Sequence, residues 1–178
     1  MKTLVVYTSQ TGFTGKYAEW LAERMQGDVL DIKDAQKKDA AFFDGYQAIV
    51  YGGWAMAGTV VKAKWFLDKA PSWTDKRLAM FCVGGSPNES PDVEKMLSNF
   101  SADEKNHNVK LFYCQGGINY EKMNTASRLT LKMFVGALKK KKDASEEVKK
   151  MAEMISKTYD ISDKKYVEPI AEYLEGGN

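Results

Sequence analysis

The sequence has few of the residues that bind metals. It contains two cysteines, Cys82 and Cys114, and a single histidine, His107. Two distant cysteines and one histidine cannot supply the clustered ligands of a metal centre, so we expect no metal site. Both cysteines lie in apolar, strand-like runs, which predicts buried free thiols in a reducing cytoplasm. His107 lies in a polar turn, and we expect it to be solvated rather than catalytic.

Long apolar runs and a strong charge imbalance are also missing. No run approaches the roughly 18 apolar residues that a membrane-spanning helix needs. The chain enters a strand-like run directly after Met1-Lys2-Thr3, which predicts that there is no secretory signal. The net charge of +2 is too small to indicate a nucleic-acid partner. We therefore expect one cytoplasmic domain that spans residues 1–178.

Short apolar runs alternate with helical patterns along the first two thirds of the chain. Most of the runs are continuously apolar, which is typical of a parallel sheet that helices cover on both faces. The sequence therefore predicts a doubly wound α/β fold. Three of the runs end in glycine pairs, and in such folds ligands bind outside the carboxyl ends of the strands. We expect strands at 4–7, 29–32, 46–51, 77–83 and 109–114, and helices at 17–25, 60–70 and from Pro91 onward.

The last third of the chain is less regular. A helix is predicted from Ser127 to Lys142, and a second helix has apolar residues at helical spacing between Val148 and Ile155. A brief strand is expected over 158–161. Pro169 lies inside the final helical pattern, which predicts a kink or a later start for that helix.

Seven residues between the first predicted strand and the first helix carry an unusual number of hydroxyl groups. The stretch contains four hydroxyl side chains and a glycine, and it ends where unpaired helix amides point outward. Those donors and the helix dipole favour a bound anion. The alternative is a plain N-cap by Thr14 or Thr11 without a ligand. The stretch is Thr8-Ser9-Gln10-Thr11-Gly12-Phe13-Thr14.

Several nucleotide-binding classes do not fit this loop. It lacks the lysine and the leading glycine of a Walker sequence, and it lacks the G-x-G-x-x-G of dinucleotide binders. A receiver domain would carry carboxylates where Thr8 and Ser9 stand. What remains is the terminal phosphate of a mononucleotide cofactor, bound by neutral donors without a metal.

The pattern Thr8-x-x-Thr11-Gly12-x-Thr14 after a first strand resembles the FMN-phosphate loop of the flavodoxin family. The resemblance implies a five-stranded parallel sheet of order 2-1-3-4-5 and the cofactor FMN. Residues 81–87 and 113–123 resemble the branch related to menaquinone-dependent protoporphyrinogen oxidase. In that branch a helical insertion interrupts the last strand. Here the insertion would cover about 115–157, and the strand would resume near 158–161.

The flavodoxin resemblance also implies a set of cofactor-binding residues. The seven loop residues from Thr8 to Thr14 would hold the phosphate. Trp54 would either stack on the flavin ring or pack as a surface aromatic. One side of the ring would be bordered by Gly53, Trp54, Ala55, Met56, Ala57 and Gly58, and the other side by Gly84, Gly85, Ser86 and Pro87.

Two functions fit a bound flavin. The first is an electron carrier that transfers electrons between redox partner proteins. The alternative is an FMN-dependent oxidoreductase of the protoporphyrinogen oxidase type that passes electrons to a quinone. A flavin-free structural role is a third possibility. No residue is predicted to be catalytic.

The basic helix that ends at Lys139–Lys142 bears on this choice. Together with Tyr120, Lys122 and Arg128 it could contact anionic lipid at the inner face of the membrane, or a carboxylated tetrapyrrole. It could equally be a core-packing helix with solvated lysines.

Overall fold

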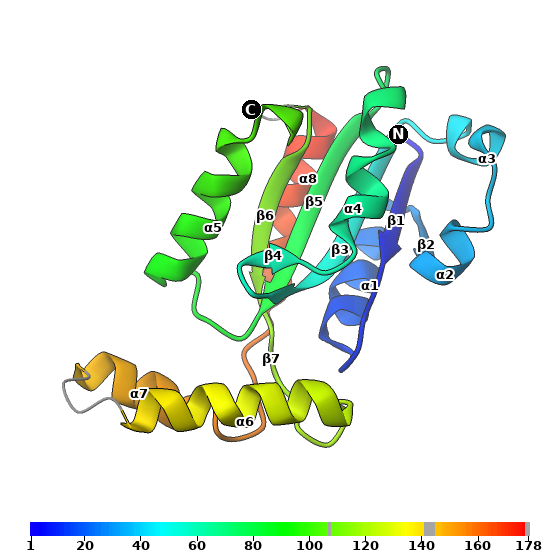
Figure 1. Cartoon of the computed structure of the whole chain (residues 1–178). Coiled ribbons are helices and arrows are strands. Elements are labelled where there is room, and N and C mark those ends of the chain that lie inside the picture. The colour runs from blue at the N-terminus through cyan, green and yellow to red at the C-terminus, as the bar shows by residue number, and fades with distance from the viewer. Residues whose placement is uncertain (107, 141–144, 177–178) are drawn as a thin grey trace.

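Five parallel strands form the centre of the computed structural model, which describes residues 1–106, 108–140 and 145–176. The strand order β2-β1-β3-β5-β6 has the predicted 2-1-3-4-5 arrangement, and each neighbouring pair runs parallel. The predicted α/β fold is therefore confirmed (Figure 1). The strands are β1 (Thr3–Tyr7), β2 (Asp28–Asp31), β3 (Ala48–Met56), β5 (Arg77–Gly84) and β6 (Lys110–Gln115).

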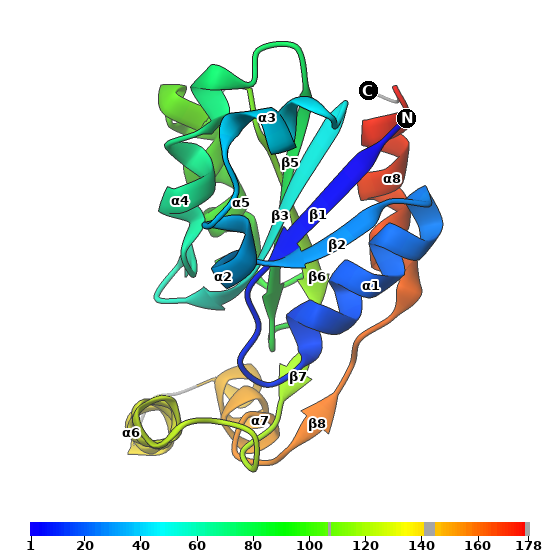
Figure 2. The ribbon, with the colours of Figure 1, turned by 90° about the vertical axis from the view of Figure 1, so that its right-hand side faces the viewer.

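Helices cover both faces of the sheet, as the continuously apolar strands predict (Figure 2). In β5, Met80 packs into the core on one face and Phe81 into the core on the other. Alternate side chains of a strand point to opposite faces, so both must be apolar when both faces are covered. One face carries α1 (Phe13–Met25) and α8 (Glu168–Glu175); the other carries α2 (Ile32–Ala35), α3 (Ala40–Asp44), α4 (Ala63–Leu67) and α5 (Pro91–Ala102), with short 3-10 turns at Ala70–Ser72 and Glu104–Asn106.

Strand β3 differs from its prediction. It does not end at Gly52-Gly53 but continues to Met56 and pairs antiparallel with β4 (Thr59–Val60). The glycines serve close packing rather than a turn: a Cβ on Gly52 would lie 2.1 Å from Cζ of Phe81. Because Val60 belongs to the hairpin, α4 begins at Ala63 instead of Val60.

The predicted insertion is present as a separate layer at one end of the sheet (Figure 1). Its small apolar cluster is built on Ile118, Val135 and Ile155. The brief strand predicted over 158–161 exists, but it pairs antiparallel with β7 in a two-stranded ribbon rather than extending β6. The insertion contains β7 (Gly117–Ile118), α6 (Thr125–Lys140), α7 (Glu146–Met154) and β8 (Tyr159–Asp160).

The chain returns to the sheet through a 3-10 turn, Lys164–Val167, and α8 then begins at Glu168 with Pro169 in its first turn. The later start that Pro169 predicted is confirmed, because proline fits the first turn, where its missing N–H is not needed. No helix among the described residues has the length and apolar character to cross a membrane.

Both cysteines are buried free thiols, as predicted. Burial raises the pKa of the Cys82 thiol to about 12 and also raises the pKa of Cys114. A buried thiol resists ionisation because the thiolate would lose its hydration. Cys82 and Cys114 are therefore packing residues of the two cores.

The contact between Gly52 and Phe81 yields a stability prediction. We expect Gly52→Ala to lower the free energy of unfolding by about 1–3 kcal/mol, because the new methyl group overlaps the Phe81 ring. Gly136→Ala in α6 is the matched control: nothing lies within 4 Å of its Cβ position, and helix propensity favours alanine by up to about 1 kcal/mol. Urea unfolding measures both variants. Equal stability of Gly52→Ala and the unmodified protein would contradict this account.

Candidate functional site at the carboxyl edge of the sheet

The hydroxyl-rich loop joins β1 to α1 and leaves the start of the helix open. Thr8 N–H donates to the carbonyl of Gly52 at 2.9 Å, which fixes the loop against β3. The N-cap is Gly12, at a φ of 100°, and no side chain caps the helix. The alternative prediction of a cap by Thr14 or Thr11 is therefore wrong. Within the described residues, the amides of Phe13, Thr14 and Gly15 have no protein acceptor, as an anion site requires.

A cavity of about 320 Å³ opens beside this loop. The insertion contributes part of its wall, since β7 and β8 run directly under the loop. Phe13 packs closely here, and a Cβ on Gly117 would lie 2.8 Å from Cζ of Phe13. The cavity is lined by Thr11, Gly12, Phe13, Lys16, Asn119, Lys122, Thr158, Tyr159 and Asp160.

Two lysines of this cavity differ in their pairing. Lys16 Nζ donates to Asp160 Oδ2 at 2.9 Å and to Ser162 Oγ at 2.7 Å. Partial burial opposes ionisation of Asp160, but hydrogen bonds from Ser162 and Lys16 lower its pKa. Lys122 Nζ lies 4.0 Å from the Cβ position of Gly12 and has no ion pair among the described residues. Lys122 is thus the unneutralised cation at the loop.

The residues predicted to border one side of a ring form a hairpin that projects from the end of β3. Gly53 is buried and Trp54 half-buried, whereas Ala55 and Met56 are exposed; Met56 keeps 56% of its surface. Ala57 and Gly58 make the turn, with φ values of 50° and 76°. An exposed apolar hairpin of this kind offers a surface on which a flat apolar ring can pack. Stacking of Trp54 stays a prediction.

The loop from Gly84 to Pro87 is held by tyrosines. The Tyr113 hydroxyl accepts from Ser86 N–H at 3.1 Å and donates to the Ser86 carbonyl at 2.9 Å. Tyr159 Oη donates to the Gly85 carbonyl at 2.6 Å, and burial raises the pKa of Tyr159 to about 12, so it stays a donor at neutral pH. The glycines make room for both rings: a Cβ on Gly84 would lie 2.5 Å from Tyr113 Oη.

One buried acceptor next to this loop is unused. Asn88 N–H donates to Gln115 Oε1 at 2.7 Å, while Asn88 Oδ1 is buried without a donor in the described part of the chain. Buried polar atoms without partners are rare and often mark functional positions. Asn88, Gln115 and Tyr159 were not assigned to the site from the sequence. The signal is tertiary, because their partners come from distant strands.

The three predicted segments meet because β1, β3 and β5 are neighbours in the sheet. Tyr7 pairs with Gly52, and Trp54 pairs with Val83, so the three strands end at the same edge. Figure 2 shows this edge at the lower end of the sheet, beside the insertion. His107, Lys141 and Lys142 lie outside the described residues.

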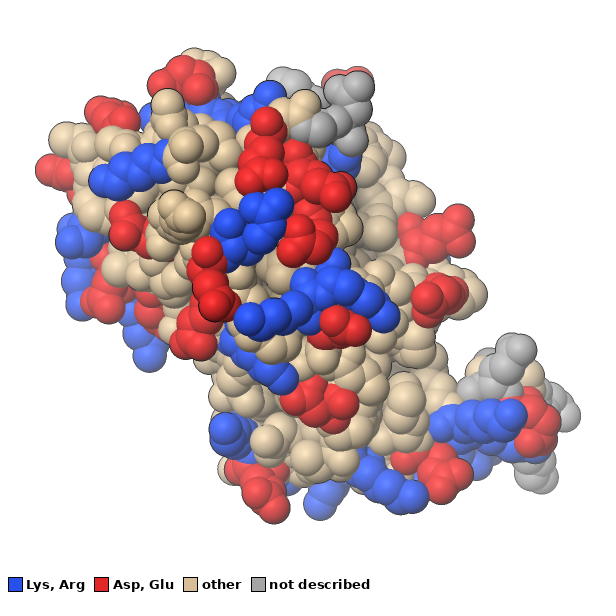
Figure 3. All heavy atoms as spheres, turned by 180° about the vertical axis from the view of Figure 1, so that it is seen from behind, with Lys and Arg blue, Asp and Glu red and all other residues tan. Residues whose placement is uncertain are grey.

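The face formed by α1 and α8 carries mixed charge (Figure 3). Arg24 pairs with Glu168 at 3.0 Å and with Glu175 at 2.9 Å, and Lys164 pairs with Glu23 at 3.0 Å. These pairs join the first helix to the C-terminal helix across the surface. Surface ion pairs of this type contribute little stability each, so the apolar core fixes the packing.

The comparisons with known proteins agree with this fold. A family model described as "Flavodoxin domain" matches residues 4–145. No curated protein matches the chain.

Several solved structures are similar. A putative flavoprotein from Bacteroides eggerthii is 16% identical, with 64% of this chain and 87% of that chain covered and a TM-score of 0.48. A flavodoxin from the domain Archaea is 14% identical, with coverage of 98% and 99% and a TM-score of 0.45. A flavoprotein in complex with FMN from Lactobacillus acidophilus is 19% identical, with coverage of 64% and 91% and a TM-score of 0.45. Matches at this level do not bear on the ligand of this chain.

Proposed function

The chain belongs to the flavodoxin-domain family, and from this premise we propose that it binds FMN and transfers electrons between redox partner proteins through the flavin. The observation that carries the proposal is the open start of α1, where Gly12 caps the helix and the amides of the first turn have no acceptor in the part of the chain that the structure describes. FMN supplies one- and two-electron redox chemistry when bound. The protein contributes binding, orientation and electrostatics.

The phosphate of FMN fits the loop and its cavity. The amides of Phe13, Thr14 and Gly15 and the hydroxyls of Thr11 and Thr14 are the donors that we assign to it. Lys122 adds a positive charge from the insertion. A phosphomonoester carries about −1.5 to −2 charges at neutral pH, so an unpaired cation nearby strengthens the site.

The flavin ring fits between the hairpin after β3 and the loop after β5. Tyr113 and Tyr159 hold the second loop in place, so that side of the site is preorganised. The exposed apolar residues Ala55 and Met56 would cover the other side. A ring held at the edge of the sheet would keep a solvent-facing margin through which partner proteins exchange electrons.

Substitution of the threonines in the loop tests the assignment of the phosphate site. We expect the double variant Thr11→Val and Thr14→Val to raise the Kd for FMN at least tenfold, because each hydrogen bond to a charged group contributes about 1.5–3 kcal/mol. Valine has the shape of threonine, so the fold should survive. Titration of flavin fluorescence measures the Kd. Thr130→Val on exposed α6 is the control, and an unchanged Kd in the double variant would exclude this loop.

The role assigned to Lys122 yields a prediction that concerns only the phosphate group of FMN. Lys122→Gln should weaken FMN binding roughly tenfold and leave riboflavin binding unchanged, because riboflavin lacks the charged group. The salt dependence of the FMN affinity should also become shallower. Lys150→Gln is the control, since Lys150 is exposed on α7 and lines neither cavity. An equal loss of affinity for FMN and for riboflavin would contradict the assignment of Lys122 to the phosphate.

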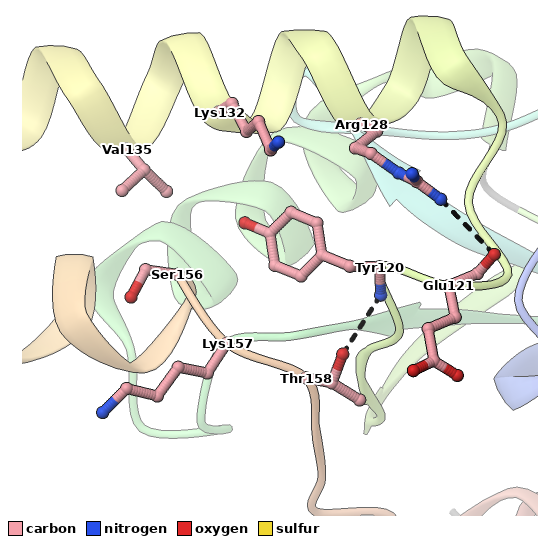
Figure 4. A pocket seen from close by; sticks show the side chains of 8 residues that line it. All are labelled: Tyr120, Glu121, Arg128, Lys132, Val135, Ser156, Lys157 and Thr158. Carbon is pink, nitrogen blue, oxygen red and sulfur yellow. Dashed lines mark hydrogen bonds between the residues drawn. The ribbon is translucent and has the colours of Figure 1, made fainter.

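A second function is supported by a second cavity. It measures about 460 Å³ and lies between α6 and the segment that leads into β8 (Figure 4). Arg128, Lys132 and Lys157 outnumber the one lining carboxylate, Glu121, although Lys157 pairs with Glu153 at 3.2 Å; Tyr120 and Val135 form an apolar wall. Among the described residues, Nε of Arg128 is buried without an acceptor, while its Nη2 donates to the carbonyls of Glu121 at 3.4 Å and Met123 at 3.5 Å. Thr158 lines both this cavity and the one beside the loop. These features suit a carboxylated aromatic substrate next to the flavin site.

The corresponding function is an FMN-dependent oxidoreductase of the protoporphyrinogen oxidase type that passes electrons to a quinone. We expect turnover of protoporphyrinogen with a menaquinone analogue if this function holds, and at least a tenfold lower kcat/KM for Arg128→Gln because a charged partner of the substrate is lost. Lys150→Gln again serves as the control. Turnover no faster than in a sample without protein would leave electron transfer between proteins as the function.

A further inference from the structure

The outer face of α6 carries large apolar side chains in water. Leu129, Met133 and Phe134 keep 60%, 68% and 52% of their surface. Leu129 and Met133 are four residues apart and are neighbours on the helix surface, and Phe134 extends the exposed apolar surface further around the helix. They account for three of the six large hydrophobic side chains that are exposed in the described chain. A contiguous exposed apolar patch marks an interaction surface.

The opposite face of α6 already attaches the helix to the protein. Val135 is buried and Leu131 and Leu138 are partly buried in the cluster with Ile118 and Ile155. Figure 4 shows Val135 and Arg128 pointing from α6 toward the cavity. The helix therefore has a second apolar face that its own packing does not use. The alternative prediction of a core-packing helix with solvated lysines accounts for Val135 but not for the exposed apolar side chains.

The charge of α6 is of one sign. Residues Thr125–Lys140 contain no aspartate or glutamate and four cations. Lys132, Lys139 and Lys140 are exposed. Lys132 lines the cavity on the inner side of the helix, whereas Lys139 and Lys140 lie in its last turn, where long side chains can reach the margin of the apolar patch. The fourth cation is Arg128, on the inner side. Figure 1 shows α6 lying across the end of the molecule where the carboxyl ends of the strands are, so its outer face is unobstructed by the sheet.

We propose that the outer face of α6 docks on an anionic lipid surface. Leu129, Met133 and Phe134 would enter the boundary between headgroups and acyl chains, and Lys139 and Lys140 would pair with lipid phosphates. The absence of acidic residues from the described helix removes the repulsion that an anionic surface would otherwise meet. Docking would bring the carboxyl edge of the sheet close to the membrane. The proposal does not depend on a bound flavin.

Co-sedimentation with vesicles tests the proposal. The protein should bind vesicles of phosphatidylcholine with 30% phosphatidylglycerol and should not bind pure phosphatidylcholine vesicles. The triple variant Leu129→Ser, Met133→Ser, Phe134→Ser should lower the partition coefficient at least tenfold, because the buried apolar area is lost. The double variant Lys139→Gln, Lys140→Gln should also lower it, and so should high salt.

Two controls distinguish binding through this surface from non-specific binding to vesicles. Val29→Ser removes another exposed apolar side chain from edge strand β2, and the triple variant Lys33→Gln, Lys37→Gln, Lys38→Gln removes three lysine charges, one more than the test variant, from the region of α2. Both should bind the vesicles like the unmodified protein, with circular dichroism spectra unchanged throughout.

Four results would overturn the proposal. The first three are failure of the unmodified protein to bind the anionic vesicles, equal binding to pure phosphatidylcholine vesicles, and an equal loss of binding in the Lys33, Lys37 and Lys38 variant. A dimer in analytical ultracentrifugation that the Leu129, Met133 and Phe134 variant dissociates would also overturn it, because the patch would then be covered by a second copy.

Discussion

The parallel pairing of β1, β3 and β5 is the constraint on which the rest of this structure depends. Parallel strands need crossover connections, so helices cover both faces and the central strands β1, β3 and β5 must be apolar on both sides. The same pairing puts the carboxyl ends of the three strands at one edge. The loop after β1, the hairpin after β3 and the loop after β5 therefore share one location, although they are about 30 to 70 residues apart in the chain.

Polar contacts then connect this edge to the insertion. Lys16 reaches Asp160 and Ser162, and the Tyr17 hydroxyl donates to the Gln115 carbonyl. Tyr159, from β8, donates to the loop after β5. The insertion thus supports the site although its own apolar cluster is small. The insertion can therefore influence a ligand bound at the edge of the sheet, because Lys16 and Tyr159, which link the insertion to the sheet, also contact or belong to the loops of the site.

The glycines at the ends of the strands show that a glycine pair can serve close packing between strands instead of a turn. Glycine pairs are typical of turns, and Gly52-Gly53 was expected to end a strand. The Phe81 ring lies where a side chain on Gly52 would be, and Val60 approaches Gly53, so both glycines lie inside a strand instead. Gly84 and Gly85 likewise give space to Tyr113 and Tyr159. Glycine is needed at these positions because large side chains from other segments pack directly against the backbone.

The sequence by itself determined the elements whose signals are local. The apolar runs, the helical spacing of Val93 and Met96, and the position of Pro169 predicted the alternation of strands and helices, the layers and the start of α8, because each follows from local geometry. The strand order was implied by the flavodoxin resemblance. The hydroxyl-rich loop was also recognisable, since its pattern lies within seven consecutive residues. Tertiary structure alone decided that Gly12 caps α1, that Lys122 stands beside it, and that Leu129, Met133 and Phe134 face solvent. The reason is physical: those facts depend on contacts between distant segments, or on which side of a helix finds a partner, and neither leaves a periodic signal in the chain.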